Sequence, residues 1–181
     1  MAKRVFKMGL NANDIKKVKQ ELINIKDVEF PAQIRELVTR LAKLGIPVIE
    51  RQVDLAKISY DEKGIQSGSD TEHQTYLDVN SYENTAVAKI VLKGRDVLFI
   101  EFGAGVYYNT PVGQSPHPQG REYGYLIGTY GLGNGAKQVW GYYDEKGELV
   151  LTRGTKATMP MHEASLEIAR KVVEVAREVF G

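Results

Sequence analysis

Two short stretches, on either side of a long glycine- and tyrosine-rich segment, decide the fold of this chain. The first, residues 98–105, reads LFIEFGAG, an apolar run that ends in a tight glycine cluster. The second, residues 154–164, reads GTKATMPMHEA and leads into a long amphipathic segment. The apolar run predicts a β-strand over residues 97–102, and the second stretch predicts the start of a helix over residues 161–180. We therefore expect a strand and a helix to hold the two ends of the segment between them.

Helical periodicity also marks the N-terminal part of the chain. A first helix is predicted over residues 13–26, with Asn13 as its cap, and a second helix begins near Pro31, which suits a first turn. Gly45 and Pro47 predict the end of this second helix. The apolar residues that recur at helical spacing are Ile15, Val18, Leu22, Ile25, Ile34, Leu37, Val38, Leu41 and Leu44. A less regular helical stretch follows over residues 48–58.

Between the predicted helices the chain carries the signals of a small sheet. Residues 74–81, 85–92 and 97–102 predict three strands joined by hairpin turns, and hence an antiparallel meander. A further hairpin is predicted from residues 139–143 and 149–152, on either side of a turn. Residues 59–73 are polar and predict a loop. Helices before and after a cluster of strands indicate an α+β fold: a small antiparallel sheet packed against N-terminal helices and a long C-terminal helix.

Residues 103–137 are the least regular part of the sequence. They contain many glycines and tyrosines, and a segment of this length without periodicity is unusual inside a compact domain. Its aromatic content argues against plain disorder. We predict a long loop that contacts with partners put in order, because such a loop loses its conformational entropy only when those contacts form.

The composition of the chain limits its domain number, its partners and its location. The 181 residues fit a single domain over residues 1–181, with 43% hydrophobic residues and a net charge of +1. This charge balance produces no strong field for nucleic acid, so we expect no sequence-specific nucleic-acid partner. There is no cysteine, which excludes disulfides and thiolate metal sites. No apolar run or N-terminal signal predicts a membrane partner or secretion, so we expect synthesis in the cytoplasm.

The sequence shows no catalytic constellation. Residues 128–137 suggest a phosphate loop, but their glycine spacing fits neither a dinucleotide fingerprint nor a nucleotide-binding loop. His73, His117 and His162 form no short metal-ligand motif. A capping or surface role is favoured for His162, next to the predicted start of the last helix. We therefore predict no enzymatic activity, no cofactor and no metal.

Glu101 and Trp140 are the two side chains with an alternative interpretation. Glu101 lies in the apolar run, and a buried carboxylate there would be a catalytic candidate. Strand alternation instead turns Glu101 toward water or a neighbouring subunit, which favours an interface or structural glutamate. Trp140, close to Tyr142 and Tyr143, could stack on bases. Core or interface packing is favoured for these hairpin aromatics.

The two stretches together resemble a family of bacteriophage neck or tail-completion proteins. Residues 99–105, FIEFGAG, resemble the family's strand end, and residues 154–164 resemble its approach to a C-terminal helix. The order of the predicted elements matches as well. This resemblance implies a structural virion protein that forms a ring, six- or twelve-fold, at the junction of head and tail. It also implies neighbouring connector, tail-terminator or tail-tube proteins as partners, in a virion or tail-like particle assembled in the bacterial host cytoplasm.

On this interpretation, the predicted subunit contacts come from the strand end, the long loop and the hairpin. The interface residues are Glu101, Phe102, Gly103, Gly105, Tyr107, Tyr108, Tyr125, Tyr130, Gly131, Gly133 and Trp140. Two alternatives stay open. One is another assembly protein of the same particle, either a tail terminator or a minor capsid component. The other is a small hydrolase or nucleotide-binding enzyme that uses residues 128–137 and Glu101.

Overall fold

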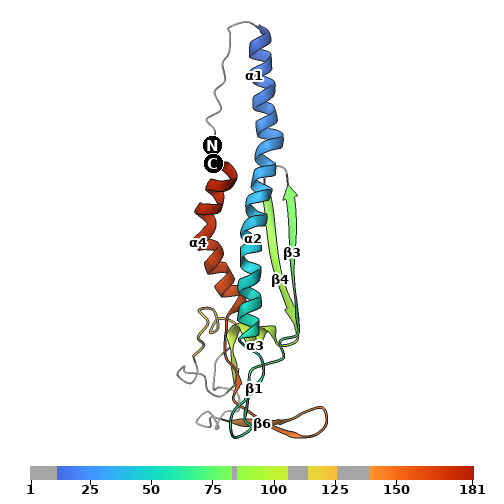
Figure 1. Cartoon of the computed structure of the whole chain (residues 1–181), viewed down its shortest axis with the longest axis vertical. Helices are drawn as coiled ribbons and strands as arrows, with labels where there is room; N and C mark the ends of the chain where they lie inside the picture. Colours follow the sequence, from blue (N-terminus) through green and yellow to red (C-terminus); the bar gives the residue numbers. More distant parts are fainter. Residues whose placement is uncertain (1–11, 83–84, 106–113, 126–138) are drawn as a thin grey trace. The chain divides into compact units, whose positions relative to one another are not determined.

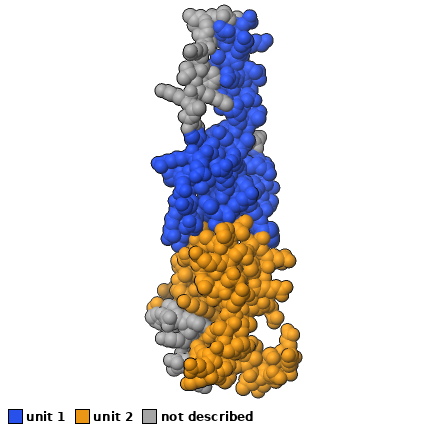
Figure 2. Space-filling model, in the orientation of Figure 1, with its two compact units in different colours: residues 1–45, 76–91, 166–181 blue, residues 46–75, 92–165 orange. Residues whose placement is uncertain are grey.

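A computed structural model of the chain describes residues 12–82, 85–105, 114–125 and 139–181. They form helices and small sheets, so the chain has the α+β fold that the sequence predicts. The fold divides into two compact units (Figure 2). Unit 1 comprises Met1–Gly45, Tyr76–Val91 and Leu166–Gly181, and unit 2 comprises Ile46–Thr75 and Leu92–Ser165. The single-domain organisation expected from chain length stays a prediction.

The two predicted N-terminal helices are one continuous helical segment. Helix α1 (Ala12–Asn24) passes through a π-helical turn, η1 (Ile25–Glu29), into helix α2 (Phe30–Asp54) (Figure 1). The Phe30 N–H bonds to the Ile25 carbonyl, five residues back, as in a π-helix. The predicted break before Pro31 is therefore wrong. A proline in the first turn of a helix and one that follows a π turn leave the same sequence signal.

The predicted stop at Gly45 and Pro47 is also wrong, since α2 continues to Asp54. A proline inside a helix removes one backbone hydrogen bond and costs roughly 3 kcal/mol. The turns that follow Pro47 bury Ile49 and Val53 completely, at 0% exposure each, which offsets that cost. Gly45 and Pro47 instead lie at the boundary between the two units, which falls after Gly45.

In unit 1, α2 lies between a strand pair and the C-terminal helix. Strands β3 (His73–Tyr82) and β4 (Thr85–Gly94) form a two-stranded sheet, and α4 (Pro160–Phe180) closes the chain, as predicted (Figure 1). On one side, Arg35 donates a hydrogen bond to the Ser81 hydroxyl at 3.3 Å. On the other side, Gln33 donates to the Val179 carbonyl at 3.4 Å, and Arg40 pairs with Glu178 at 3.3 Å.

Unit 2 contains a four-stranded sheet of order β1-β2-β7-β6. The predicted hairpin is confirmed as β6 (Trp140–Tyr143) and β7 (Leu149–Thr152), which pair antiparallel. The predicted loop over residues 59–73 also contributes two short strands, β1 (Ser59–Tyr60) and β2 (Gln66–Ser67). Strand β2 pairs with β7 in parallel, so this sheet is mixed. Two-residue strands carry no periodic signal, and only their tertiary partners produce them.

The third strand of the predicted meander is a helix. Residues Val97–Phe102 form α3, and only Ala104–Gly105 are extended, as β5. A short apolar run cannot be assigned to strand or buried helix by periodicity alone. Adjacent residues of α3, Ile100 and Glu101, are both buried, whereas a strand would turn them to opposite faces. Strand β5 pairs antiparallel with β8 (Gly154–Thr155).

The described helices include none that is both long and apolar enough to cross a membrane.

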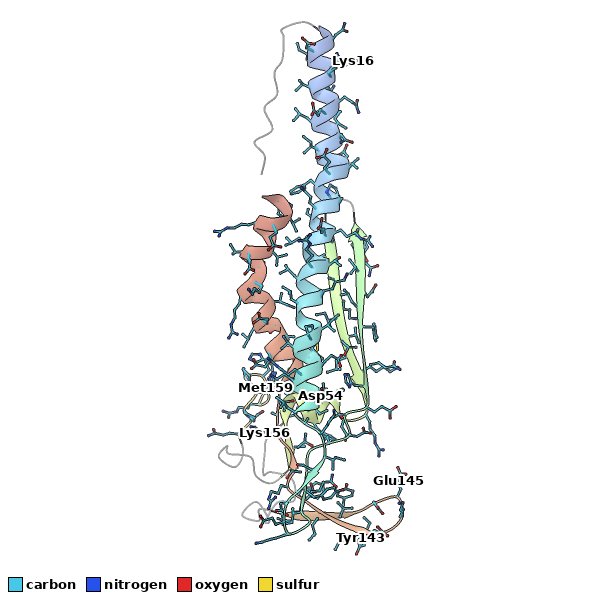
Figure 3. The ribbon with its side chains drawn as sticks, viewed as in Figure 1. Lys16, Asp54, Tyr143, Glu145, Lys156 and Met159 are labelled. Atoms are coloured by element: carbon cyan, nitrogen blue, oxygen red, sulfur yellow. The ribbon has the colours of Figure 1, made fainter. Side chains whose placement is uncertain are left out.

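The largest fully buried side chains belong to unit 2 and come from α2, α3 and the start of α4: Ile49, Val53, Ile100 and Pro160. Labelled side chains in Figure 3 mark the end of α2 at Asp54, the turn of the β6–β7 hairpin at Glu145 and the approach to α4 at Met159. The core of unit 2 thus joins elements from three distant parts of the sequence.

Candidate functional site

The centre of unit 2 is a buried carboxylate that caps the N-terminus of α4. Glu101 is only 7% exposed. Its Oε2 accepts a hydrogen bond from the Met161 N–H at 2.8 Å, and its Oε1 accepts one from the His162 N–H at 3.0 Å. These N–H groups have no partner inside the helix, and the helix dipole favours a negative charge at this end. The cap therefore comes from α3, 60 residues before the helix that it stabilises.

A third hydrogen bond to this carboxylate defines the state of a buried histidine. His117 is 5% exposed, and its Nε2 lies 3.1 Å from Oε1 of Glu101. Its Nδ1 accepts a hydrogen bond from the Gln119 N–H at 3.0 Å. Because Nδ1 is an acceptor, the ring proton of the neutral imidazole lies on Nε2 and is donated to Glu101. The hydrogen bonds to Gln119 and Glu101 thus fix the orientation of the His117 ring.

Aromatic rings surround this pair. Phe102 stacks on Tyr125, with ring centroids 4.6 Å apart and an interplanar angle of 14°. Phe102 also meets His117 edge-on at 4.5 Å, and His117 meets His162 at 5.1 Å. These side chains line a cavity of about 740 Å³. The predicted strand end and the predicted start of the last helix are thus one packed cluster.

The same two stretches also meet at a pair of glycines, Gly105 and Gly154, which we call the glycine crossing. Gly105 lies opposite Gly154 in the β5–β8 pair, and both have positive φ, 115° and 90°. A Cβ on Gly154 would lie 2.2 Å from the Ala104 carbonyl oxygen, and a Cβ on Gly105 would lie 2.3 Å from the Arg153 oxygen. Neither position has room for a side chain. The two backbones approach this closely because both residues are glycine.

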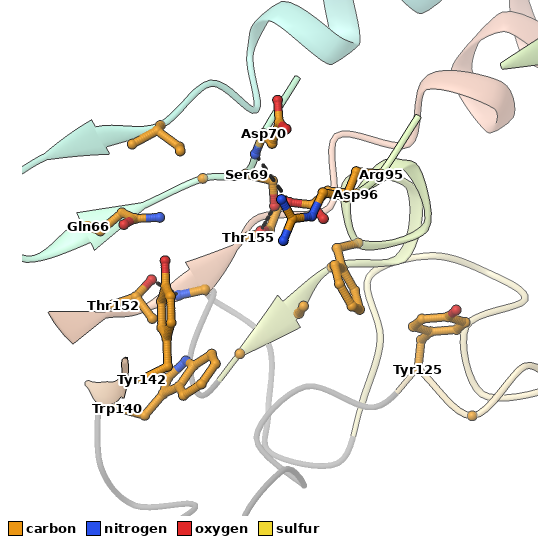
Figure 4. A pocket seen from close by; sticks show the side chains of 18 residues that line it. Gln66, Ser69, Asp70, Arg95, Asp96, Tyr125, Trp140, Tyr142, Thr152 and Thr155 are labelled. Atoms are coloured by element: carbon orange, nitrogen blue, oxygen red, sulfur yellow. Dashed lines mark hydrogen bonds between the residues drawn. The ribbon is translucent and has the colours of Figure 1, made fainter. Parts of the chain in front are cut away.

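A second cavity of unit 2, about 700 Å³, has an aromatic side and a polar side (Figure 4). Trp140 and Tyr142, with ring centroids 5.8 Å apart, lie on one side, and Tyr125 lies on another. The polar side contains a hydrogen bond between the Ser69 and Thr155 hydroxyls, and Arg95. Aromatic faces with a few polar groups suit the burial of an apolar side chain or chain segment.

Another histidine of unit 2, His73, has a hydrogen-bond acceptor at each ring nitrogen. Nδ1 of His73 lies 2.7 Å from the Thr71 carbonyl oxygen, and Nε2 lies 2.7 Å from a carboxylate oxygen of Glu50. Both ring nitrogens face acceptors, which favours the imidazolium. The hydrogen bond to Thr71 is the main cause that raises the pKa of His73, and Glu50 adds to it, while burial opposes it.

The structure brings together several of the residues that the sequence singled out. Glu101, Phe102 and Tyr125 belong to the capped cluster, while Gly103, Gly105, Tyr125 and Trp140 line the second cavity. Tyr107, Tyr108, Tyr130, Gly131 and Gly133, and the glycine-rich residues 128–137, lie outside the described residues. The predicted exposure of Glu101 on a strand face is wrong, because α3 buries it. Whether any of these residues contacts another subunit stays a prediction.

Sequence reasoning missed the roles of two histidines. His117 had no assigned role, because its only local signal is a position between two prolines, and its partner Glu101 is distant in sequence. His162 was expected in a capping or surface role; its own N–H is the group that is capped, by Glu101. Acidic residues one turn into a helix are easily found by pattern, whereas a cap supplied by a distant element has no local pattern.

Comparisons of the chain with protein-family models, with curated proteins and with solved structures found no match. The described residues contain no group of three or more His, Asp or Glu side chains that could hold a metal ion. All three hydrogen bonds at Glu101 come from groups of the chain itself. The arrangement is thus suited to holding α3 against the start of α4.

Proposed function

We propose that this chain is a structural virion protein that forms a ring and joins or completes the tail at the head–tail junction of a bacteriophage or tail-like particle. The observation that carries the proposal is the contact between the two stretches that resemble the neck family. Glu101 caps α4, and Gly105 pairs with Gly154, so the two motifs contact each other at two places in unit 2.

The segment between the two motifs is flanked by residues that line the same cavity of unit 2. Gly105, the last residue of β5, and Trp140, the first residue of β6, both line the 700 Å³ cavity. A segment anchored in this way supports the proposed role, in which it extends to a neighbouring subunit. Residues 114–125 of this segment already pack within unit 2, through His117 and Tyr125, so the proposed contact with a neighbouring subunit concerns the rest of the segment.

One face of the β6–β7 hairpin supports the same proposal. Tyr143 and Leu149 are direct cross-strand partners, 74% and 59% exposed, and Leu151 on the same face is 45% exposed. Contiguous exposed apolar side chains on a hairpin are typical of protein–protein contacts. We propose this hairpin face as part of the ring interface, beside the residues predicted from the sequence.

The test has two parts. Negative-stain imaging of native particles with a labelled antibody should place the chain at the head–tail junction; label elsewhere on the particle overturns the neck assignment. Label at the far end of the tail, or over the capsid, would instead support a tail terminator or a minor capsid component. Genes for a connector on one side and for tail tube or sheath on the other would favour the neck.

The interface is tested with recombinant protein and a matched pair of leucine variants. Leu149→Gln should reduce the ring population seen by native mass spectrometry at least tenfold. Leu55→Gln makes the same change at a position that is 68% exposed, outside the hairpin, and should leave the ring population unchanged. Equal behaviour of the two variants would contradict the proposed hairpin contact.

The enzymatic alternative is tested by thermal-shift measurements with nucleotides and divalent metals. A shift of the midpoint with any of these ligands would favour the hydrolase or nucleotide-binding function over the structural one. The three hydrogen bonds that engage Glu101 favour the structural function.

A further inference from the structure

Helix α1 carries an apolar seam that the described part of the fold leaves open. Ile15, Val18, Leu22 and Ile25 are spaced by three, four and three residues, which is the a/d spacing of a coiled coil. Ile15 is 49% exposed and Leu22 is 51% exposed, and no described side chain of α1 is buried. Apolar side chains at a/d spacing usually pack against another helix, so the seam favours a covering helix.

The three–four spacing of the seam continues along α2 on its side toward α4. Counted with one extra residue after Ile25, this spacing continues through Phe30, Gln33, Leu37, Arg40 and Leu44, of which Gln33 and Arg40 are polar, while Phe30 and Leu44 are 47% and 37% exposed. Phe30 contacts Phe180 with ring centroids 6.0 Å apart, and Gln33 and Arg40 bond to Val179 and Glu178. These contacts place the seam of α2 on the face toward α4.

The π turn keeps the two parts of the seam in line. In an uninterrupted α-helix, five residues would rotate Phe30 by roughly 140° from Ile25. The wider π turn at Ile25–Glu29 absorbs the extra residue. Because α4 ends at Phe180, opposite Phe30, the apolar seam of α1 lies beyond the end of α4.

The charges that flank the seam indicate what covers it. With Ile15 and Leu22 at a, Glu21 occupies position g and Lys26 occupies the following e position. One heptad earlier, Asp14 and Lys19 occupy the same two positions. In a parallel coiled coil, g of one helix faces the next e of its neighbour, so both pairs are opposite in charge. In an antiparallel pair, g faces g and e faces e, and every such pair would repel.

We propose that α1 is a self-association surface that packs in parallel against α1 of further copies of this chain. The core residues favour more than two strands, since Leu22 lies at a and the β-branched Val18 and Ile25 lie at d. This surface belongs to unit 1 and is separate from the ring contacts proposed in unit 2, so it does not depend on the proposed function.

Cysteine cross-linking tests the proposal directly, because the natural chain has no cysteine. In a parallel assembly, the a residues of neighbouring helices lie side by side. Leu22→Cys should therefore form a disulfide-linked dimer on mild oxidation of the full chain. The matched control is Ile23→Cys, at an adjacent position that is 39% exposed and off the seam. Cross-linking of Leu22→Cys at least tenfold faster than the control supports the proposal, and equal rates overturn it.

Charge reversal tests the parallel orientation. Glu21→Lys alone places two lysines opposite each other and should slow cross-linking of the Leu22→Cys chain several-fold. Lys26→Glu alone should do the same with two acidic residues. The combined variant Glu21→Lys/Lys26→Glu restores opposite pairs and should restore the rate. Failure of the combined variant to recover would overturn the parallel arrangement.

The remaining outcomes concern a different occupant of the seam. Deletion of residues 1–11 should leave Leu22→Cys cross-linking unchanged. If the deletion creates cross-linking that the full chain lacks, the chain's own N-terminal segment covers the seam and the proposal is overturned. A full chain that sediments as a monomer at about 100 µM and fails to cross-link overturns it as well. Circular dichroism of each variant shows whether the helices remain intact.

Discussion

Replacement of Glu101 by glutamine tests the central feature of unit 2. The native carboxylate accepts hydrogen bonds from the Met161 N–H, the His162 N–H and Nε2 of His117. Glutamine keeps one acceptor oxygen, which can serve the last two groups. Its NH₂ group then faces the Met161 N–H, donor against donor, and the negative charge at the helix N-terminus is lost.

The magnitude follows from these losses. A hydrogen bond to a charged group contributes about 1.5–3 kcal/mol, and an unsatisfied buried donor costs about 1–3 kcal/mol. We expect Glu101→Gln to lower the free energy of unfolding by about 2–4 kcal/mol. The matched control is Glu163→Gln, the same change in the first turn of α4, which should cost only about 0.3–1 kcal/mol through the helix dipole.

Urea denaturation followed by circular dichroism provides the measurement, with Trp140 fluorescence as a second probe. Hydrogen exchange at the Met161 and His162 amides gives a local readout, and Glu101→Gln should accelerate exchange at both. A loss below about 1 kcal/mol, or one equal to that of the Glu163→Gln control, would refute the capping argument. Unchanged exchange at the two amides would refute it independently.

Three further predictions follow from the neighbouring contacts. His117→Ala should cost about 2–4 kcal/mol, and a double-mutant cycle with Glu101→Gln should show coupling of about 0.5–3 kcal/mol; additive losses would contradict the direct contact. His73 has a raised pKa, so its contribution to stability is fully present below pH 6.5 and is lost as pH rises through the folded pKa. The stability difference between the native chain and His73→Gln, measured by urea denaturation, should therefore shrink with rising pH, and a difference that grows would contradict it. Gly154→Ala should cost at least about 3 kcal/mol, because of strain and a backbone clash, whereas Gly147→Ala has positive φ but open space and should cost about 1–2 kcal/mol. Equal midpoint shifts for the two glycine variants would contradict the glycine crossing.

Where sequence reasoning succeeded, the signal was local and repeated. The C-terminal helix, the β6–β7 hairpin and the pair β3–β4 all follow from periodicity over ten to twenty residues or from a turn between alternating strands. Where it failed, two structures share one local pattern. The apolar run of α3 reads equally well as a buried strand. The π turn at Ile25–Glu29 appears in sequence only as one extra residue in the seam.

The α+β class, the helical seam and its flanking charges are properties of the sequence by itself, since each depends on spacing along one element. The capped cluster is not. Glu101 caps α4 only because α3 forms and lies against the start of a helix 60 residues later. The glycine crossing likewise requires β5 and β8 to meet before Gly105 and Gly154 have a reason to lack side chains. Hydrogen bonds and close contacts between distant residues leave no periodic trace, so only the tertiary structure decided which residues hold the two motifs together.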